Sequence, residues 1–130
     1  MIEKTVVEGL SRPQFLEAVQ RSGLLSEQQL EMLDQTNPTA DAHQLKQSLI
    51  ESGTLTWYQC ESIAQGEGDR LRIGNYEVLD RLGSGGMGTV LKARHRRMKR
   101  IVALKVLAKE LSSDPSFVQR FQREVETIAR

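Results

Sequence analysis

The residues best suited to chemistry lie in the second half of the sequence, in a glycine-rich loop. The loop contains the pattern G-x-G-x-x-G-x-V and reads Gly83-Ser84-Gly85-Gly86-Met87-Gly88-Thr89-Val90. Glycines allow backbone N–H groups to approach phosphate oxygens without interference from a Cβ atom. The pattern therefore indicates a phosphate-binding loop, and the alternative is a glycine-rich hairpin that binds no ligand.

The residues that follow the loop indicate which kind of phosphate loop it is. A dinucleotide-binding turn requires a helix directly after the glycines. Residues 89–94 read TVLKAR instead, which has the extended character of a strand. The sequence therefore predicts a β-hairpin that covers phosphates rather than a Rossmann turn.

A lysine stands in the middle of IVALKVL, the most strand-like run of the chain. Alternation along a strand places Lys105 on one face with Ile101, Ala103 and Leu107. An ammonium group among such apolar neighbours is expected to be buried enough to need an anion, either a phosphate or a carboxylate. The alternative is a lysine whose ammonium group extends to solvent.

A carboxylate is predicted on the helix expected over residues 116–130. At about 100° per residue, Glu124 falls at the edge of the helix's apolar stripe and Glu126 falls on the solvent side. The stripe consists of Phe117, Phe121, Val125 and Ile128. A carboxylate that faces the core needs a cation, so Glu124 is the candidate partner of Lys105. The alternative is an exposed Glu124 paired with nearby arginines.

Together, GSGGMGTV, VALK and the helix that carries Glu124 resemble the N-terminal lobe of protein kinases. The loop is most similar to that of bacterial serine/threonine kinases of the eukaryotic type. The spacing from Gly83 to Lys105, and from Lys105 to Glu124, agrees with the pattern of that family. The first half of the chain, followed by GNYEVLDRLG, resembles the leader of kinases from planctomycete-type bacteria.

The resemblance implies ATP as the bound nucleotide and protein serine or threonine as the substrate of the parent enzyme. It implies that Lys105 holds the α- and β-phosphates and that Glu124 orients Lys105. Leu82, Val90 and Ala103 would cover the adenine, and the glycines would cover the phosphates. The complete set of ATP-binding residues implied in this way is Leu82, Gly83, Ser84, Gly85, Gly86, Met87, Gly88, Val90, Ala103 and Lys105.

The family's later motifs are not found in this sequence. It contains neither H-R-D-x-x-x-x-N, which supplies the catalytic aspartate, nor D-F-G, which supplies a Mg²⁺ ligand. We therefore predict no metal site in this chain and expect Mg²⁺ only in the full-length kinase. The chain alone is expected to be inactive.

The first half reads as a small all-helical module. Two copies of a helix–SGxL(S/T)–helix unit can be aligned with each other. Gly23 is expected to stop a helix, and Ser26 is expected to cap the next one. The alignment includes Ser22/Ser52, Gly23/Gly53, Leu25/Leu55, Ser26/Thr56 and Gln29/Gln59. The module is interpreted either as a packing scaffold or as a docking module for a protein partner.

These elements predict an α+β chain in three parts. The parts are a helical module over residues 1–66, a linker over residues 67–72 and an incomplete kinase lobe over residues 73–130. The lobe is expected to be a three-stranded antiparallel sheet with one helix, and in its first strand Tyr76, Val78, Asp80 and Leu82 are expected to share one side.

Charge and composition limit the remaining possibilities. Residues 1–70 carry a net charge of −6 and residues 71–130 carry +7, which indicates two units with different roles. The basic run over residues 92–100 lacks interleaved aromatics, so a solvated turn is preferred to a nucleic-acid site. No apolar run approaches the roughly 20 residues of a membrane span. A single cysteine, Cys60, fits a reducing compartment, and a cytoplasmic location is expected.

Overall fold

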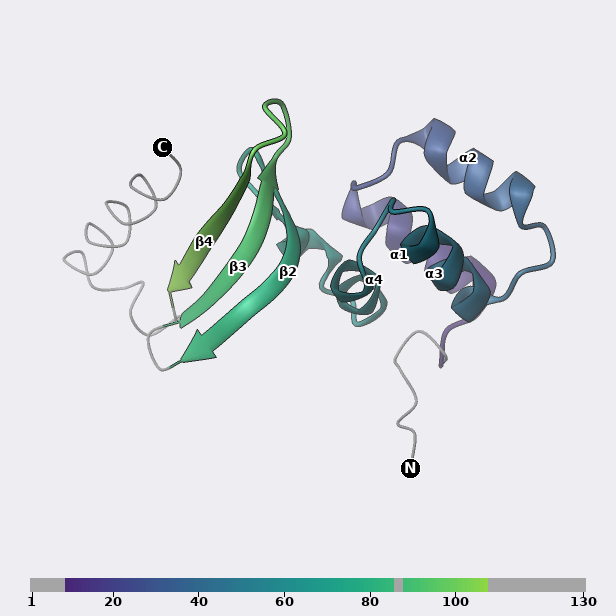
Figure 1. Ribbon diagram of the computed structural model, residues 1–130. Helices are drawn as coiled ribbons and strands as arrows, with labels where there is room; N and C mark the ends of the chain where they lie inside the picture. The colour runs from purple at the N-terminus through teal and green to yellow at the C-terminus, as the bar shows by residue number, and fades with distance from the viewer. Residues whose placement is uncertain (1–8, 86–87, 108–130) are drawn as a thin grey trace. The chain divides into compact units, whose positions relative to one another are not determined.

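The computed structural model describes residues 9–85 and 88–107. The chain divides into two compact units, Met1–Arg72 and Ile73–Arg130. The first contains helices and the second contains an antiparallel sheet (Figure 1), so the expected α+β class is confirmed. The helix expected over residues 116–130 lies outside the described residues.

The described residues of the first unit form four α-helices: α1 (Arg12–Ser22), α2 (Glu27–Thr36), α3 (Ala42–Glu51) and α4 (Trp57–Ala64). Each begins with a capping box, in which the N-cap side chain accepts from the N3 backbone and a glutamine at N3 reaches back. Such caps satisfy backbone donors that the first turn leaves unpaired. The N-caps recur at even intervals along the chain, at Ser11, Ser26, Asp41 and Thr56.

The helix stop predicted at Gly23 and the cap predicted at Ser26 are both confirmed. Gly23 closes α1 with φ 71°, a left-handed conformation that glycine adopts without the Cβ penalty of other residues. Gly53 takes a similar φ of 74° just after α3. The two SG pairs noted in the sequence therefore stand where helices end.

The core of the helical unit is built mainly by α1, α3 and α4. Helix α1 contacts each of the other three helices. Helix α2 buries Leu33 and no other residue. The most completely buried apolar side chains of the unit, each 2% exposed or less, are Phe15, Val19, Ala42, Leu45, Leu49, Cys60, Ile63 and Leu71.

A buried ion pair joins α3 to α4. The Lys46 ammonium lies 2.8 Å from the Glu61 carboxylate, and the two side chains are only 5% and 8% exposed. The ammonium also lies 5.2 Å from the centre of the Trp57 ring, at a distance typical of a cation–π contact. Beside the pair, burial raises the pKa of the Cys60 thiol to about 12, so this sulfur stays protonated near neutral pH.

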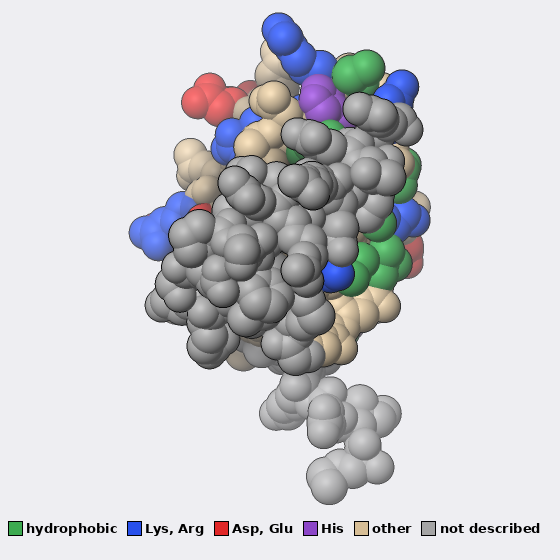
Figure 2. Space-filling model, turned by 90° about the vertical axis from the view of Figure 1, so that its left-hand side faces the viewer, with side chains coloured by type: hydrophobic (Ala, Val, Ile, Leu, Met, Phe, Trp, Pro, Cys, Tyr) green, Lys and Arg blue, Asp and Glu red, His purple; other side chains and the backbone are tan. Residues whose placement is uncertain are grey.

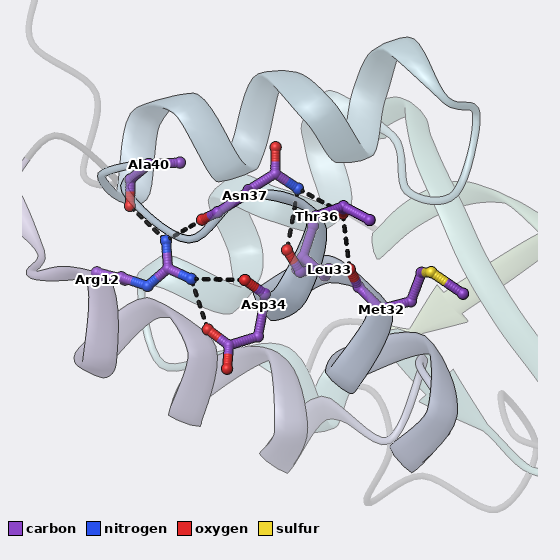
Figure 3. A network of polar contacts seen from close by, with 7 residues as sticks. All are labelled: Arg12, Met32, Leu33, Asp34, Thr36, Asn37 and Ala40. Atoms are coloured by element: carbon purple, nitrogen blue, oxygen red, sulfur yellow. Dashed lines mark hydrogen bonds and ion pairs between the residues drawn. The ribbon is translucent and has the colours of Figure 1, made fainter.

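A polar network joins Arg12 of α1 to the end of α2 and to the segment between α2 and α3 (Figure 3). The Arg12 guanidinium donates to the backbone oxygens of Asn37, Ala40 and Asp34, and it forms an ion pair with the Asp34 carboxylate. The Asn37 side chain donates to the Leu33 backbone oxygen at 2.9 Å. A single arginine of α1 therefore satisfies carbonyl groups at and just beyond the end of α2.

Residues 67–72, expected to be a linker, contain the short 3-10 helix η2 (Gly68–Leu71). Helix η2 contacts both α1 and α4, and Leu71 is 1% exposed. A Cβ atom added at Gly68 would lie 3.1 Å from the Cβ of Ser22, so the close approach favours a glycine. This segment is packed against the helices that precede it.

Within the described ranges, the second unit forms a four-stranded antiparallel sheet in the order β1-β2-β3-β4. Its strands are β1 (Arg72–Ile73), β2 (Tyr76–Gly85), β3 (Gly88–His95) and β4 (Ile101–Leu107). The three strands predicted from the sequence are present, and the short β1 is the additional one. Ala93, Val102 and Leu104 form a buried cluster on one face, and Tyr76 packs against it.

The strict alternation expected along β2 is wrong because the strand contains two irregularities. Val78 lies opposite Ala93, whereas Asp80 lies opposite Lys92, the adjacent residue of β3. Two residues on one strand opposite one residue on the other define a bulge, which reverses the face that later residues occupy. Val78 and Asp80 are therefore on opposite faces, and a second irregularity falls between Arg81 and Gly83.

Candidate functional site

The glycine-rich loop lies at the end of the β2–β3 hairpin. Gly83 pairs with Val90, Ser84 with Thr89 and Gly85 with Gly88. A strand follows the glycines directly, so the chain forms the hairpin expected from the sequence and not the strand–helix turn of a dinucleotide site. Gly86 and Met87, both candidate site residues, lie outside the described residues.

The glycines of the hairpin end are exposed. Gly83, Ser84 and Gly85 are all solvent-accessible, and the neighbouring Leu82 is 58% exposed. A Cβ atom added at Gly83 or Gly85 would meet nothing within 4 Å. Packing therefore does not require glycine at these two positions. Gly88 has φ 142°, a conformation that L-residues rarely adopt.

The strand register brings three of the candidate residues to one face of the sheet. Val90 of β3 lies opposite Lys105 of β4, and Lys92 lies opposite Ala103. Residues directly opposite each other point to the same face, and residues two apart on one strand share that face. Val90, Ala103 and Lys105 therefore lie together, and Gly83 is the partner of Val90 on the other side.

The burial expected for the Lys105 face differs from the structure. Lys105 and Ala103 are half-buried, and Ile101 on the same side is 50% exposed. The buried side chains of β4 are Val102 and Leu104, because Tyr76 and Ala93 pack on their face. Lys105 thus retains access to solvent. Its candidate partner Glu124 lies outside the described residues.

Two charged residues on the Lys105 side of the sheet are absent from the site expected from the sequence. Asp80 of β2 lies opposite Lys92 of β3, and Lys92 in turn lies opposite Ala103. The bulge at Leu79 moves Asp80 to this face, and bulges have no clear signal in a period-two pattern. Lys92 could have been found by alternation from Val90.

The turn between β3 and β4 is basic and exposed. The Glu77 carboxylate lies 3.4 Å from Arg94 and 3.6 Å from Arg96, while the His95 Nδ1 accepts from the backbone N–H groups of Arg97 and Met98. Figure 2 shows Lys and Arg side chains around the top of the view. The turn is organised by its own hydrogen bonds and surrounded by solvent, which fits the solvated turn preferred from the sequence.

The part of the chain that the structure describes contains neither a metal-binding cluster nor a membrane-spanning helix. No group of three or more His, Cys, Asp or Glu side chains there is arranged to hold a metal ion. Among the helices of the described ranges, none is long and apolar enough to cross a membrane.

Comparison with known proteins shows similarity to bacterial serine/threonine-protein kinases. The chain is 46% identical over 56 residues to PknA of Mycobacterium tuberculosis, a match that covers 43% of this chain and 13% of PknA. It is 46% identical over 59 residues to PknE of Mycobacterium bovis, covering 45% of this chain and 10% of PknE. It is 53% identical over 58 residues to AfsK of Streptomyces coelicolor, covering 45% of this chain and 7% of AfsK.

These matches support the resemblance to bacterial serine/threonine kinases. They are consistent with a fragment of a bacterial kinase of the eukaryotic type. No protein-family model matches the chain. The matched segments span only a small part of the curated relatives, between 7% and 13% of their length.

Proposed function

We propose that this chain is the N-terminal part of a serine/threonine-protein kinase, and that its β2–β3 hairpin covers the phosphates of ATP. The parent enzyme would transfer the γ-phosphate of ATP to serine or threonine of a protein substrate. The lone cysteine is buried and the matched relatives are bacterial kinases, which supports the bacterial cytoplasm as the compartment of this chain.

One observation supports the nucleotide site more than any other. The register of β3 and β4 places Val90, Ala103 and Lys105 on one face, beside a hairpin whose exposed glycines have no packing reason to be glycine. A ligand whose oxygens approach the backbone closely would explain why glycine occupies these positions. Apolar side chains next to an ammonium group suit a nucleotide, because adenine and phosphate need different neighbours.

Each residue of the site has a distinct role in the proposal. Lys105 neutralises the α- and β-phosphates, and Glu124 fixes the position of Lys105. Leu82, Val90 and Ala103 contact the adenine, and the loop from Gly83 to Gly88 donates backbone N–H groups to the phosphates. Mg²⁺ would be held by residues of the full-length kinase that this sequence does not contain.

The nucleotide site is tested by titrating the full chain with a fluorescent ATP analogue. Lys105→Met removes a charge-assisted contact and is expected to weaken binding about tenfold. Lys99→Met removes the same charge from the exposed β3–β4 turn and serves as the matched control. Equal effects of the two substitutions would show that the analogue responds to overall charge, and they would contradict the proposed nucleotide site.

The same proposal predicts that this chain alone transfers no phosphate. Neither the aspartate that accepts the substrate proton nor the metal ligands are among its residues. The measurement is transfer of the γ-phosphate to a generic protein substrate in the presence of Mg²⁺. Turnover that persists through repurification and disappears in Lys105→Met would contradict the prediction.

The helical unit supports a second function, as a module that binds a protein partner. Met32 and Trp57 are 63% and 57% exposed, although both are large and apolar. Exposed Met and Trp side chains are more frequent at protein–protein interfaces than on the rest of a protein surface.

A further inference from the structure

A groove of about 450 Å³ separates α1 from α2 and carries an unbalanced charge. As far as the described residues go, its lining includes four carboxylates and neither lysine nor arginine. The lining residues are Pro13, Leu16, Glu17, Gln20, Glu27, Leu30, Glu31 and Asp34. Leucines from both helices therefore meet acidic side chains within one groove.

Two of the four carboxylates are already paired with cations outside the groove lining. Glu17 pairs with Arg21 at 2.8 Å, and Asp34 pairs with Arg12. Glu27 and Glu31 form no ion pair with the Lys, Arg or His side chains of the described ranges. Like charges four residues apart on a helix destabilise it, so a cation between these two glutamates would stabilise α2.

The α3–α4 helix pair shows how a cation neutralises a glutamate at this position. When the two helix pairs are aligned on Gly23 and Gly53, Leu16 and Glu31 correspond to Lys46 and Glu61. Lys46 and Glu61 form the buried 2.8 Å ion pair between α3 and α4. In the α1–α2 pair the glutamate is present, but a leucine stands where the lysine would be. The first helix pair therefore has the acceptor of this interaction without its donor.

The exposed face of α2 leads to the same conclusion. In α3, the first, fourth, fifth and eighth residues after the N-cap are all buried, and they are Ala42, Leu45, Lys46 and Leu49. In α2 the same four positions are all unburied, and they are Glu27, Leu30, Glu31 and Asp34. Helix α2 thus presents to the groove the stripe that α3 buries in the core.

From this arrangement we propose that the α1–α2 groove binds a lysine-bearing amphipathic helix of a partner protein. The partner's ammonium group takes the place toward Glu31 that Lys46 takes toward Glu61. Leu16 and Leu30 contact the apolar side of the partner helix, and Glu27 receives a second lysine one helical turn away. This inference does not depend on the nucleotide site, because it uses only residues of the helical unit.

The first experiment measures binding of a fluorescein-labelled helical peptide of leucine and lysine to the full chain by anisotropy. Glu31→Gln is expected to weaken binding about fivefold. Glu51→Gln removes the same charge from an exposed position on α3 and is expected to change binding by less than about twofold. Equal effects would mean general attraction to an acidic surface, and they would overturn the proposal.

A second variant tests the geometry taken from the other helix pair. Leu16→Lys supplies an internal ammonium group opposite Glu31, so it should abolish peptide binding while the chain keeps its thermal unfolding temperature. Gln20→Lys adds the same charge at the groove edge and should weaken binding less. Undiminished binding to a folded Leu16→Lys chain overturns the proposal. If Leu16→Lys does not fold, the comparison of Glu31→Gln with Glu51→Gln decides the question.

Discussion

At the scale of single residues, Lys46 and Glu61 show how charge is accommodated inside the helical unit. Each side chain is less than a tenth exposed, and they neutralise each other at 2.8 Å. Burying an isolated charge is costly, so each of the two side chains offsets the cost of burying the other. Lys46 falls on the apolar stripe of α3, a position where sequence periodicity alone would expect a leucine like Leu16.

We predict that Lys46→Met destabilises the folded chain by about 3 kcal/mol, because it leaves Glu61 buried without a cation. Arg21→Met breaks the exposed pair with Glu17, whose side chains are 79% and 61% exposed, and should cost less than about 0.5 kcal/mol. Urea unfolding of both variants measures the difference. Similar midpoints would show that the Lys46–Glu61 pair contributes no more than a surface pair does.

The residues of the candidate site show what a sequence reveals and what it leaves open. The positions of Lys105 and Ala103 on one face could be predicted, because β4 is regular and its alternation is intact. Val90 joins them through the register of β3 with β4, which the sequence does not indicate. The degree of burial could not be predicted, since it depends on which face Tyr76 and its neighbours cover. Periodicity predicts which residues share a face of the sheet, and packing determines which face is buried.

At the scale of elements, helix ends are more predictable than strand registers. A cap is a local event: the Ser26 side chain accepts from the backbone N–H three residues away, and the Gly23 backbone N–H donates to the Gln20 carbonyl. Ser26 and Gly23 could therefore be assigned from sequence alone, and both assignments are confirmed. The even interval of all four capping boxes is also visible in the sequence, as glutamines at positions 14, 29, 44 and 59. The alignment of helix pairs does not reveal it, because it compares the first box only with the third and the second only with the fourth.

Strand registers depend on contacts that are distant in sequence. The bulge between Val78 and Asp80 exists because two strands pair out of step, and no single residue in YEVLDRL indicates it. The expectation that Val78 and Asp80 share a side is wrong for this reason. The bulge has a consequence for the site, since it brings Asp80 opposite Lys92 and adds a carboxylate to the face that carries Lys105.

Helix η2 is a similar case at the boundary of the first unit. QGEGDR is polar and contains two glycines, so composition indicates a linker. Gly68 is nevertheless buried against Ser22, and the next apolar residue, Leu71, is buried too. The polar composition of a segment predicts its exposed residues well, but it does not reveal that one or two residues of the segment are buried.

At the scale of the whole molecule, the chain consists of two units with opposite charge. The helical unit is acidic, and the sheet unit is basic. The helical unit has its own caps, its own core and an internal ion pair. The sheet unit contains the proposed nucleotide site, and its resemblance to kinases carries the proposed activity.

We predict that residues 1–72 fold without the rest of the chain, because α1, α4 and η2 contact one another and all three lie within the first unit. The prediction is stricter than the boundary at residue 66 that composition suggests. Leu71 is 1% exposed, and loss of a fully buried leucine typically costs about 2–5 kcal/mol. The fragment 1–66 should therefore unfold at a lower temperature than the fragment 1–72.

Circular dichroism through a thermal ramp measures this difference, and Leu71→Ala in the fragment 1–72 provides the matched control. The substitution removes the buried side chain and keeps the chain length, so it should reproduce most of the loss seen in 1–66. A random-coil spectrum of 1–72 at low temperature would refute independent folding. Identical melting of 1–66 and 1–72 would show that η2 does not stabilise the helices, even though it packs on α1 and α4.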